Sequence, residues 1–269
     1  MIPYNDMNLV AVIDVLFHSE LIDGKLREFT EFRFGLDFET TSTNTNYTIK
    51  FDAMKASGVL EEKTITAYKG TDVKITMENS LSTNNVAYGN YIMKIYIPKD
   101  ATGVTKYNFY ESKLLDSVHY LDLTKVTTFA GLFNNCSYLK EVNNLIMEPD
   151  NIIKDASYMF SNCIRLEELD RLIIPDAVDV TSLFLGCSEL KHVGYLDISS
   201  ATNAYQLFGQ CRKLESIDTL VANNLKCIEY MFANCSNLIT APVFNTTNAD
   251  STAGMFLNCT SLTSVPLYD

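Results

Sequence analysis

The sequence predicts an α+β fold in two parts: a small antiparallel β domain at residues 1–105 and, at residues 107–269, a solenoid of repeats about 24 residues long. The solenoid is predicted by a phrase, Phe-x-x-Cys-x-x-Leu, that recurs through the second part of the chain. The β domain is predicted by alternating apolar and polar residues in the first part, where the phrase is absent. Stacked repeats bury a face that one repeat alone could not bury.

The phrase keeps its register from copy to copy. The first interval is 27 residues and the other four are 24, so we expect an additional loop near Glu148–Asp150 in the longer copy. The Phe of the phrase falls at Phe133, Phe160, Phe184, Phe208, Phe232 and Phe256. The Cys falls at Cys136, Cys163, Cys187, Cys211, Cys235 and Cys259, and the Leu at Leu139, Leu166, Leu190, Leu214, Leu238 and Leu262.

The β domain is expected to have a sandwich-like arrangement. Its first segment fits two structures: Asp6 can cap a short helix whose apolar positions begin at Leu9, but the β-branched content favours a strand nearly as much. Lys69–Asp72 is expected to close a hairpin, and the polar stretches Glu39–Asn46 and Asn79–Asn90 are expected to be long loops. The five predicted strands are Phe32–Phe38, Tyr47–Phe51, a strand around Ile65, Val73–Met77 and Tyr91–Ile97.

The solenoid is expected to begin before the first cysteine. Pro98–Asn108 has the Pro and Gly content of a connector. One repeat length before the first full copy, Ser112 takes the place of the cysteine in an otherwise compatible pattern, as is expected of a terminal repeat. The solenoid would then hold one degenerate and six full repeats. The degenerate copy has its template residues at Phe109, Ser112, Leu115, Val118 and Leu121.

Each repeat is expected to contain a short helical turn and a short strand. Hydrophobic residues seven, four and one positions before the Phe, as in Leu225, Ile228 and Met231, have the spacing of a short α- or 3₁₀-helix. After the Leu, apolar residues at alternate positions, such as Leu172 and Ile174, predict a strand that points these side chains inward. Stacked repeats would place the strands in a narrow parallel sheet.

The cysteines are expected to be reduced and buried. Six of the seven share one repeat position, and the sequence contains no Cys-x-x-Cys pair. Cysteine packs as a small hydrophobe in protein interiors. Steric considerations do not exclude a disulfide between neighbouring repeats, because stacked strands lie about 5 Å apart. Cys227 is off the repeat position and is expected to be the exposed thiol. We expect neither a metal nor a cofactor.

The net charge excludes two classes of partner. The chain of 269 residues has a formal net charge of −12, and residues 109–269 contain 19 acidic and 10 basic residues. This field repels nucleic acid and anionic membranes, so we expect no nucleic-acid binding and no membrane insertion. The N-terminus has no basic residue, and Asp14 interrupts the apolar run from Leu9 to Phe17, so a signal peptide is not expected.

The repeat phrase resembles that of a known family. Phe-x-x-Cys-x-x-Leu followed by Leu-x-Leu or Leu-x-Ile is similar to the BspA-type leucine-rich repeats of bacterial surface proteins. The resemblance covers residues 107–269 and implies a leucine-rich-repeat solenoid without enzymatic activity that acts in adhesion. It implies the bacterial cell surface for a mature form; without a signal or anchor the expected location is the cytoplasm or a virion. The longer phrase Met-Phe-x-x-Cys-x-x-Leu occurs at Met159–Leu166, Met231–Leu238 and Met255–Leu262.

The sequence offers little for catalysis. His18, His119 and His192 are far apart, and the last two occupy nearly equivalent positions three repeats apart. A nucleophile elbow, a phosphate-binding loop and the His/Cys spacing of a metal site are absent from the sequence. The acidic pair Glu167–Glu168 is expected on a solvated surface. We therefore expect a protein without enzymatic activity.

The candidate binding site is the outward face of the stacked strands, where residues are free to vary between repeats. Tyr and Arg are common interface anchors, and a line of exposed Ile and Val is more apolar than solubility requires. The alternative is a face that is solvated or covered by the β domain. The candidates are Tyr120, Asp122, Asn144, Ile146, Arg171, Ile173, Tyr195, Asp197 and Val221.

Two hypotheses of function follow. In the first, the repeats of a non-catalytic binding protein recognise a protein or glycan in adhesion, while the β domain positions or attaches them, or the two tasks are exchanged. In the second, the chain is a structural component of a larger assembly, such as a bacteriophage virion or fibre. The last repeat ends at Tyr268–Asp269 without a polar cap, so self-association or packing on a partner is also expected there.

Overall fold

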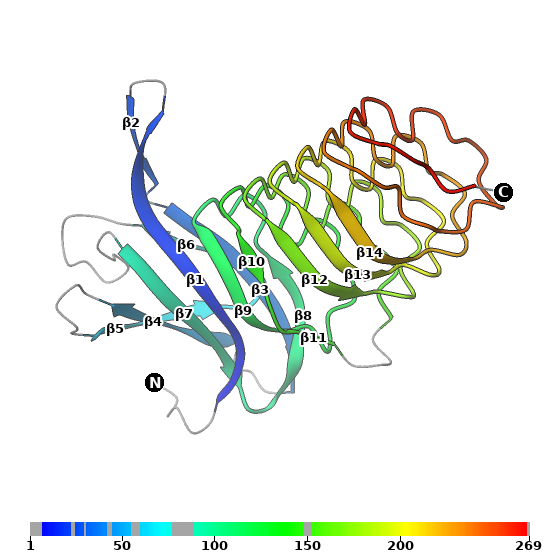
Figure 1. Cartoon of the computed structure of the whole chain (residues 1–269). Coiled ribbons are helices and arrows are strands. Elements are labelled where there is room, and N and C mark those ends of the chain that lie inside the picture. The colour runs from blue at the N-terminus through cyan, green and yellow to red at the C-terminus, as the bar shows by residue number, and fades with distance from the viewer. Residues whose placement is uncertain are drawn as a thin grey trace. The chain divides into compact units, whose positions relative to one another are not determined.

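The computed structural model describes residues 7–22, 25–29, 31–41, 45–54, 60–76, 89–147 and 152–267 (Figure 1). The chain divides into two compact units. The first spans Met1–Val126 and Val142–Asn151, and the second spans Thr127–Glu141 and Ile152–Asp269. Within the described residues every regular element is a strand. The domain boundary placed between residues 105 and 107 stays a prediction.

The first unit is built from two sheets. Its strands are β1 (Met7–Ile22), β2 (Lys25–Phe29), β3 (Glu31–Thr40), β4 (Asn46–Met54), β5 (Leu60–Tyr68), β6 (Asp72–Thr76), β7 (Gly89–Pro98), β8 (Ala101–Asn108), β9 (Leu115–Asp122), β10 (Glu141–Val142) and β11 (Leu145–Ile146). The larger sheet has the order β10-β9-β1-β7-β4-β5, with β2 beside β1 and β11 beside β9, and the smaller sheet has the order β6-β3-β8.

Alternating side chains form the core of the first unit. Phe32, Phe34 and Phe38 of β3 are buried, and so are Tyr47 and Ile49 of β4. The centroids of the Phe34 and Tyr47 rings are 6.3 Å apart, although β3 belongs to the smaller sheet and β4 to the larger one. The two sheets therefore pack face to face around an apolar layer, as half-buried antiparallel strands do in sandwiches.

The N-terminal segment is a strand, so its helical alternative is wrong. β1 pairs with β7 on one side and with β9 on the other. The alternate residues Ile13 and Val15 are buried. The apolar spacing of the segment fits a helix and a strand almost equally well, and the two partner strands, which lie far away in the sequence, decide the outcome.

The turn at Lys69–Asp72 does not close a hairpin. Gly70 has a φ of +70°, and the Thr71 amide donates to the Tyr68 carbonyl over 3.3 Å, as in an ordinary β-turn. The strands before and after the turn belong to different sheets, because β5 pairs with β4 and β6 pairs with β3. The five predicted strands correspond to β3–β7. Residues 42–44 of the first predicted loop, residues 79–88 of the second and all of 148–150 lie outside the described residues. Residues 39–40, 46 and 89–90 of the predicted loops belong to strands instead.

The stretch Pro98–Asn108 is mainly a strand, so its assignment as a connector is wrong. Its residues 101–108 form β8, which pairs with β3 from Ala101 to Asn108. The template residues that follow, Phe109, Ser112, Leu115, Val118 and Leu121, are all buried. Leu121 on β9 pairs in parallel with Leu145 on β11, one repeat length later. The repeat register therefore extends back to β9, within the first unit.

The second unit contains a parallel sheet of β12 (Glu168–Ile173), β13 (His192–Asp197) and β14 (Ser216–Val221), seen side by side in Figure 1. Its register is one whole repeat, so that Leu172 lies beside Leu196 and Leu196 beside Leu220. These three leucines are buried. The narrow parallel sheet predicted from the repeat is confirmed.

Phenylalanine rings of the phrase stack along the interior of the second unit. Centroids of neighbouring rings are 5.1 to 5.5 Å apart, and their planes differ by at most 18°. This separation is close to the spacing of about 4.8 Å between hydrogen-bonded strands. Each ring therefore covers the ring of the next coil and holds the coils in register. The stacked rings are Phe133, Phe160, Phe184, Phe208, Phe232 and Phe256.

The turn before each cysteine is not helical, so the predicted short helix is wrong for the described coils. Around Phe160, the Met159 amide donates to the Ala156 carbonyl over 3.3 Å, and the Cys163 amide donates to the Phe160 carbonyl over 3.0 Å. Each of these turns contains a residue of positive φ, Tyr158 or Asn162, both at 58°. A right-handed helix cannot include a left-handed residue, and the chain forms successive β-turns instead.

Left-handed residues recur at two positions of each coil, two residues before and two residues after the Phe. Gly and Asn tolerate this conformation best, and they dominate the second position. The first position holds Gly131, Tyr158, Ser182, Gln206, Tyr230 and Gly254, and the second holds Asn135, Asn162, Gly186, Gln210, Asn234 and Asn258. This recurrence of Gly and Asn is the sequence signal that argues against a helix.

All seven cysteines are free thiols, in agreement with the predicted reduced ladder. Each phrase cysteine from the second copy onward donates its thiol to the carbonyl of the Phe one coil earlier, as Cys187 does to Phe160 over 3.0 Å and Cys211 to Phe184 over 3.1 Å. Cys227 is half-buried, as is Cys259 at the last phrase position.

Candidate binding face

The outward side of β12–β14 is the candidate binding face, and the parallel register of the strands aligns its side chains. Arg171 lies beside Tyr195 and Tyr195 beside Thr219, while Ile173 lies beside Asp197 and Asp197 beside Val221. The structure thus brings together five of the predicted site residues within one sheet. We refer to the outward residues of these three strands as the β12–β14 face.

A cation–π contact lies on this face. The guanidinium carbon of Arg171 is 5.3 Å from the centroid of the Tyr195 ring. Arg171 is exposed and Tyr195 is half-buried. An arginine over a tyrosine ring is held by the ring quadrupole and loses part of its conformational freedom before any partner arrives.

The face is acidic around this contact. Glu168 and Asp170 are exposed on β12, and neither side chain makes a hydrogen bond or an ion pair with any described residue. Asp197 uses one carboxylate oxygen to accept the Ser199 amide over 3.1 Å. Asp218 on β14 is the fourth acidic side chain, and Arg171 is the counter-charge on the three strands.

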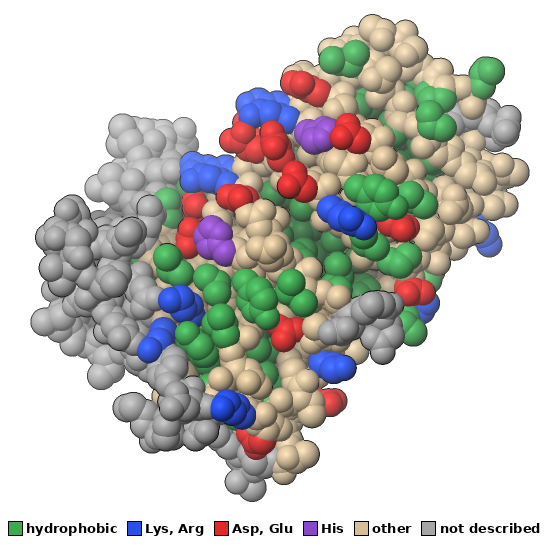
Figure 2. Space-filling view, turned by 60° about the horizontal axis from the view of Figure 1, so that its bottom comes forward, with side chains coloured by type: hydrophobic (Ala, Val, Ile, Leu, Met, Phe, Trp, Pro, Cys, Tyr) green, Lys and Arg blue, Asp and Glu red, His purple; other side chains and the backbone are tan. Residues whose placement is uncertain are grey.

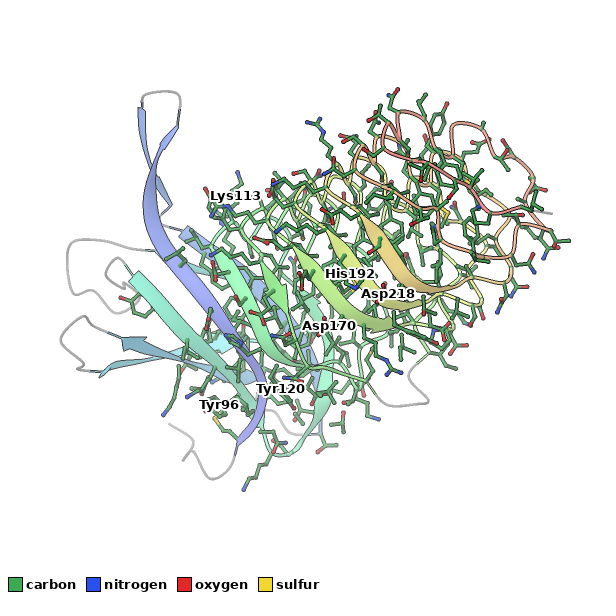
Figure 3. The ribbon with its side chains drawn as sticks, viewed as in Figure 1. Tyr96, Lys113, Tyr120, Asp170, His192 and Asp218 are labelled. Carbon is green, nitrogen blue, oxygen red and sulfur yellow. The ribbon has the colours of Figure 1, made fainter. Side chains whose placement is uncertain are left out.

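His192 links two neighbours on the face. Its Nδ1 lies 3.0 Å from the Ser216 hydroxyl, and its Nε2 lies 3.3 Å from Asp218 Oδ2; His192 and Asp218 are labelled in Figure 3. Figure 2 shows acidic side chains gathered next to the histidines. Serine, histidine and aspartate are the residue types of a hydrolytic triad, and no sequence motif had predicted that these three residues would meet.

The geometry of these three residues is that of a surface network. In a triad the acid is buried and fixes the histidine in a site from which water is excluded. The side chain of Asp218 is 63% exposed and that of His192 is 34% exposed. Water competes for every hydrogen bond here, so the arrangement lacks the environment that activates a serine.

Gly194 occupies the middle of β13 because neighbouring strands approach closely there. A Cβ at this position would lie 2.5 Å from the Asp170 carbonyl oxygen, well inside van der Waals contact. The outward side of the sheet therefore carries no side chain between Asp170 on β12 and Asp218 on β14. The backbone at Gly194 is left accessible to a partner.

Four other predicted site residues lie in the first unit. Tyr120 and Asp122 are on β9, and Ile146 on β11 pairs with Asp122. Burial raises the pKa of the Tyr120 hydroxyl, and the Asp122 carboxylate raises it further. Asn144 has a φ of +45° and donates its amide to the His119 carbonyl over 3.0 Å. The predicted candidates therefore form two groups, one in each unit.

Ion pairs line the same coils just before the strands. Lys191 Nζ lies 2.5 Å from Glu167 Oε2, and Lys213 Nζ lies 2.5 Å from Glu189 Oε2, in each case one repeat apart. The hydrogen bond from Lys191 lowers the pKa of Glu167 and raises that of Lys191. Pairs as exposed as these contribute little to stability, and Lys191 also interacts electrostatically with Glu168 of the β12–β14 face.

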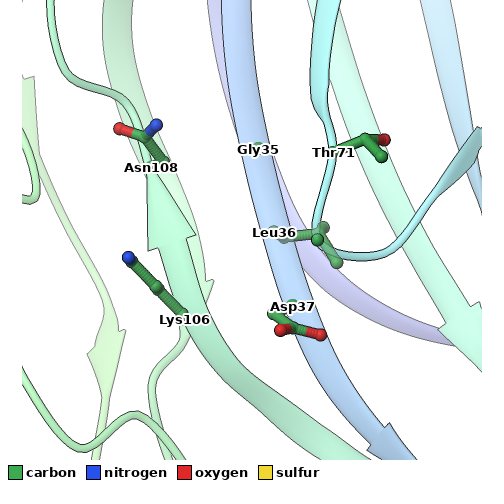
Figure 4. Close-up of a pocket in the computed structure, with 7 residues that line it drawn as sticks. Gly35, Leu36, Asp37, Thr71, Lys106 and Asn108 are labelled. Atoms are coloured by element: carbon green, nitrogen blue, oxygen red, sulfur yellow. The ribbon is translucent and has the colours of Figure 1, made fainter.

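A small hollow of about 180 Å³ in the first unit does not have the geometry of a catalytic site (Figure 4). It is lined by Gly35 and Asp37 of β3, Lys106 and Asn108 of β8, and residues of the nearby turn. In Figure 4 the labelled side chains point in different directions and do not converge. Among the described residues, no group of three or more His, Cys, Asp or Glu side chains could hold a metal ion.

The strands of the face start earlier than the sequence pattern indicated. Each has inward residues three positions apart, such as Leu169 and Leu172, with two outward residues between them. The alternating pattern alone therefore did not place Glu168, His192 and Ser216 in the strands. The recurring spacing Leu-x-x-Leu, Val-x-x-Leu and Ile-x-x-Leu at the start of the strands could have revealed them.

Comparisons with known proteins identify the repeats. A family model described as "BspA type Leucine rich repeat region (6 copies)" matches residues 69–180. A second model, "Mycoplasma protein of unknown function, DUF285", matches residues 154–266. No curated protein and no solved structure matches the chain. Within the described residues no helix is long and apolar enough to cross a membrane. Over residues 69–180 the chain is therefore similar to the BspA-type leucine-rich repeat family.

Proposed function

We propose that this protein is a non-catalytic binding protein that recognises a protein or glycan partner through the β12–β14 face. Leucine-rich repeats of this type are binding scaffolds. The observation that carries the proposal is the Arg171–Tyr195 contact, because it places two residue types that dominate interface energetics in the middle of an exposed, regular surface.

Pre-organisation supports this role for Arg171. Immobilising a flexible side chain on binding costs roughly 0.5–1.5 kcal/mol. The Tyr195 ring already restricts the guanidinium, so part of this cost is met in the free protein. The contact leaves the exposed N–H groups of Arg171 available to acceptors on a partner.

The charge of the face supports a partner with basic groups. Glu168, Asp170, Asp197 and Asp218 outnumber Arg171 on the three strands. Complementary charge speeds encounter and favours one orientation of the partner. Binding at this face should therefore weaken as ionic strength rises, because exposed charges are screened over a Debye length of about 8 Å at physiological salt.

Partner capture tests the proposal. The tagged protein, the double variant Arg171→Ala with Tyr195→Ala, and the control Lys226→Ala are each incubated with an extract of the producing cells, and bound molecules are quantified by mass spectrometry. Lys226 is exposed in the same unit but outside the face. We expect the double variant to lose at least about tenfold of its specific capture, equivalent to about 1.4 kcal/mol. Equal capture by all three proteins would reject the face as the site.

The biological setting is tested by co-purification of the untagged protein. Its presence in fixed ratio to the other proteins of purified virus particles would establish the assembly role and contradict adhesion. Cleavage by protease added to intact cells would establish surface exposure and contradict the virion role.

The non-catalytic part of the proposal is tested at Ser216. A fluorophosphonate probe labels serines that a neighbouring histidine activates. We expect no labelling of Ser216, because His192 and Asp218 are solvated. Labelling that disappears in Ser216→Ala and in His192→Ala would show an activated nucleophile and would contradict a purely binding role.

A further inference from the structure

A trough of about 430 Å³ lies along the turns of three consecutive coils in the second unit. Each coil contributes the left-handed residue that follows its Phe and the residue two positions later. None of these residues belongs to the β12–β14 face. All lining side chains are polar, and they are Gln210, Arg212, Asn234, Ser236, Asn258 and Thr260.

Left-handed backbone shapes one wall of the trough. Gln210, Asn234 and Asn258 have φ values of 63°, 65° and 60°. Their equivalent conformations place three amide side chains in a row, one from each coil. An amide row can serve stability alone through hydrogen bonds between neighbours, so the direction of each hydrogen bond decides which groups are left for a ligand.

Only one hydrogen bond joins the amides of the trough. Asn258 Nδ2 donates to Asn234 Oδ1 over 2.8 Å. This bond occupies an acceptor of Asn234 and leaves its Nδ2 as a donor, while it leaves Asn258 Oδ1 as an acceptor. The Gln210 amide has no side-chain partner among the described residues. The row therefore presents donors on Gln210 and Asn234 and an acceptor on Asn258.

The two hydroxyl groups are acceptors toward the trough. Ser236 Oγ donates to the Arg212 carbonyl over 3.1 Å, and Thr260 Oγ1 donates to the Ser236 carbonyl over 3.3 Å. Each hydroxyl has a single proton, which these bonds use. The hydroxyl oxygens of Ser236 and Thr260 are therefore left as acceptors, and hydrogen-bond donors of a ligand can approach them.

Arg212 supplies the charge of the trough. Its guanidinium is exposed and makes no ion pair with any described residue, although the chain has a net charge of −12. Acidic side chains are absent from the lining. An arginine with free N–H groups beside amide donors is a binding group for a carboxylate, which it can contact through two parallel hydrogen bonds.

We propose that this trough binds an acidic sugar, a hydroxyl-bearing ring with a carboxylate group. The carboxylate contacts Arg212 and the amide donors of Gln210 and Asn234. The sugar hydroxyls donate to the hydroxyl oxygens of Ser236 and Thr260 and to the side-chain oxygen Oδ1 of Asn258. The polarity of the trough, with donors at one end and acceptors at the other, matches this ligand, and the volume lies within the roughly 300–1,000 Å³ of small-molecule sites.

The experiment compares three probes by calorimetry and by the side-chain NMR signals of the full chain. Trigalacturonate carries both features, galactotriose carries the hydroxyls without the carboxylates, and acetate carries a carboxylate alone. We expect trigalacturonate to bind at least about tenfold more tightly than either of the others. We also expect it to shift the Arg212 Nε and the Gln210 and Asn234 amide signals.

Variants locate the site. Arg212→Gln should lower the affinity for trigalacturonate at least about tenfold, Arg212→Lys should retain an intermediate affinity, and the matched control Lys226→Gln should bind normally. The double variant at Arg171 and Tyr195 should also bind the sugar normally, because the trough is separate from the β12–β14 face. Folding of each variant is checked by its thermal transition.

Three results would overturn the proposal. One is equal affinity for galactotriose, because the carboxylate would then have no role. Another is equal affinity for acetate, which would indicate an adventitious anion site only. The third is full binding by a folded Arg212→Gln protein. All of these leave the proposed function of the β12–β14 face untouched, since that proposal is tested with different residues.

Discussion

At the scale of single residues, the cysteine ladder explains why cysteine recurs in the phrase. The thiol of Cys163 donates to the Phe133 carbonyl over 3.1 Å, and the same bond recurs in the following coils. A small apolar side chain with one weak donor suits a position that is both buried and next to a carbonyl. The phrase therefore specifies packing and a hydrogen bond between coils.

Thiol labelling tests the ladder. Burial raises the pKa of Cys163, Cys211 and Cys235, so these thiols stay protonated at pH 8 in the folded protein. We expect a disulfide reagent to modify Cys227 and Cys259 first and the buried thiols only after unfolding. Rapid modification of every cysteine in folded protein would contradict the ladder.

The raised thiol pKa values also predict how the stability of the folded protein changes with pH. The folded state holds these protons more tightly than the unfolded chain, whose thiols titrate near pH 8.5. Their contribution to stability is complete below that pH and decreases as the pH rises through the folded-state values of Cys163 and Cys211. We expect the midpoint of urea unfolding to fall between pH 8 and pH 10 under reducing conditions. A rising midpoint would contradict it.

Tyr158 tests the left-handed turns. It is exposed and has a φ of +58°, at a coil position where two other coils have Gly131 and Gly254. A left-handed L-residue costs roughly 1–2 kcal/mol. Tyr158→Val should therefore destabilise the protein by about 1 kcal/mol, whereas Tyr158→Gly should be neutral or stabilising, as measured by urea unfolding. Equal effects of the two substitutions would argue against a left-handed residue here.

At the scale of elements, a strand could be predicted from the sequence where the pattern that specifies it lies within the strand itself. The strands β3 and β7 could be predicted because alternation reflects burial on one face of the same strand. The short helix could not, because apolar spacing before Phe160 is the same in a helix and in successive turns, and only the recurring Gly and Asn distinguish them. β1 and β8 depend on partners far away in the sequence.

Gly194 tests the packing of the parallel sheet. An added Cβ would lie 2.5 Å from the Asp170 carbonyl, a backbone atom that can move only with β12. Overpacking of this kind typically costs about 1–3 kcal/mol. We expect Gly194→Ala to lower the free energy of unfolding by that amount, and the exposed neighbour substitution Thr219→Ala to change it little. A stable Gly194→Ala protein would show that β12 and β13 are less closely spaced.

At the scale of the whole molecule, the repeat register was the most predictable property and the candidate site the least. The period fixed which residues point outward, so Arg171 and Tyr195 could be named as neighbours from sequence alone. Their ring contact, and the meeting of His192 with Ser216 and Asp218, depend on side-chain conformations across strands. The trough likewise depends on left-handed turns that the helical interpretation did not contain.

Stacking of the coils predicts how stability is distributed in the second unit. Phe208 is fully buried between Phe184 and Phe232, whereas Phe256 is half-buried. Removal of a buried phenylalanine typically costs about 3–5 kcal/mol. We expect Phe208→Ala to cost this much and Phe256→Ala clearly less, because each repeat contacts only its neighbours. Equal losses in urea unfolding would contradict a stacked array.

Site-specific photo-crosslinking tests most directly whether the β12–β14 face is the binding surface. A photo-reactive phenylalanine is introduced at Thr219, beside Tyr195 on the face, and in a second protein at Lys226, outside it. We predict that irradiation with the molecules captured from the producing cells links a partner to the Thr219 protein and not to the Lys226 protein. Crosslinks of equal yield at both positions, or crosslinks at Lys226 alone, would contradict it.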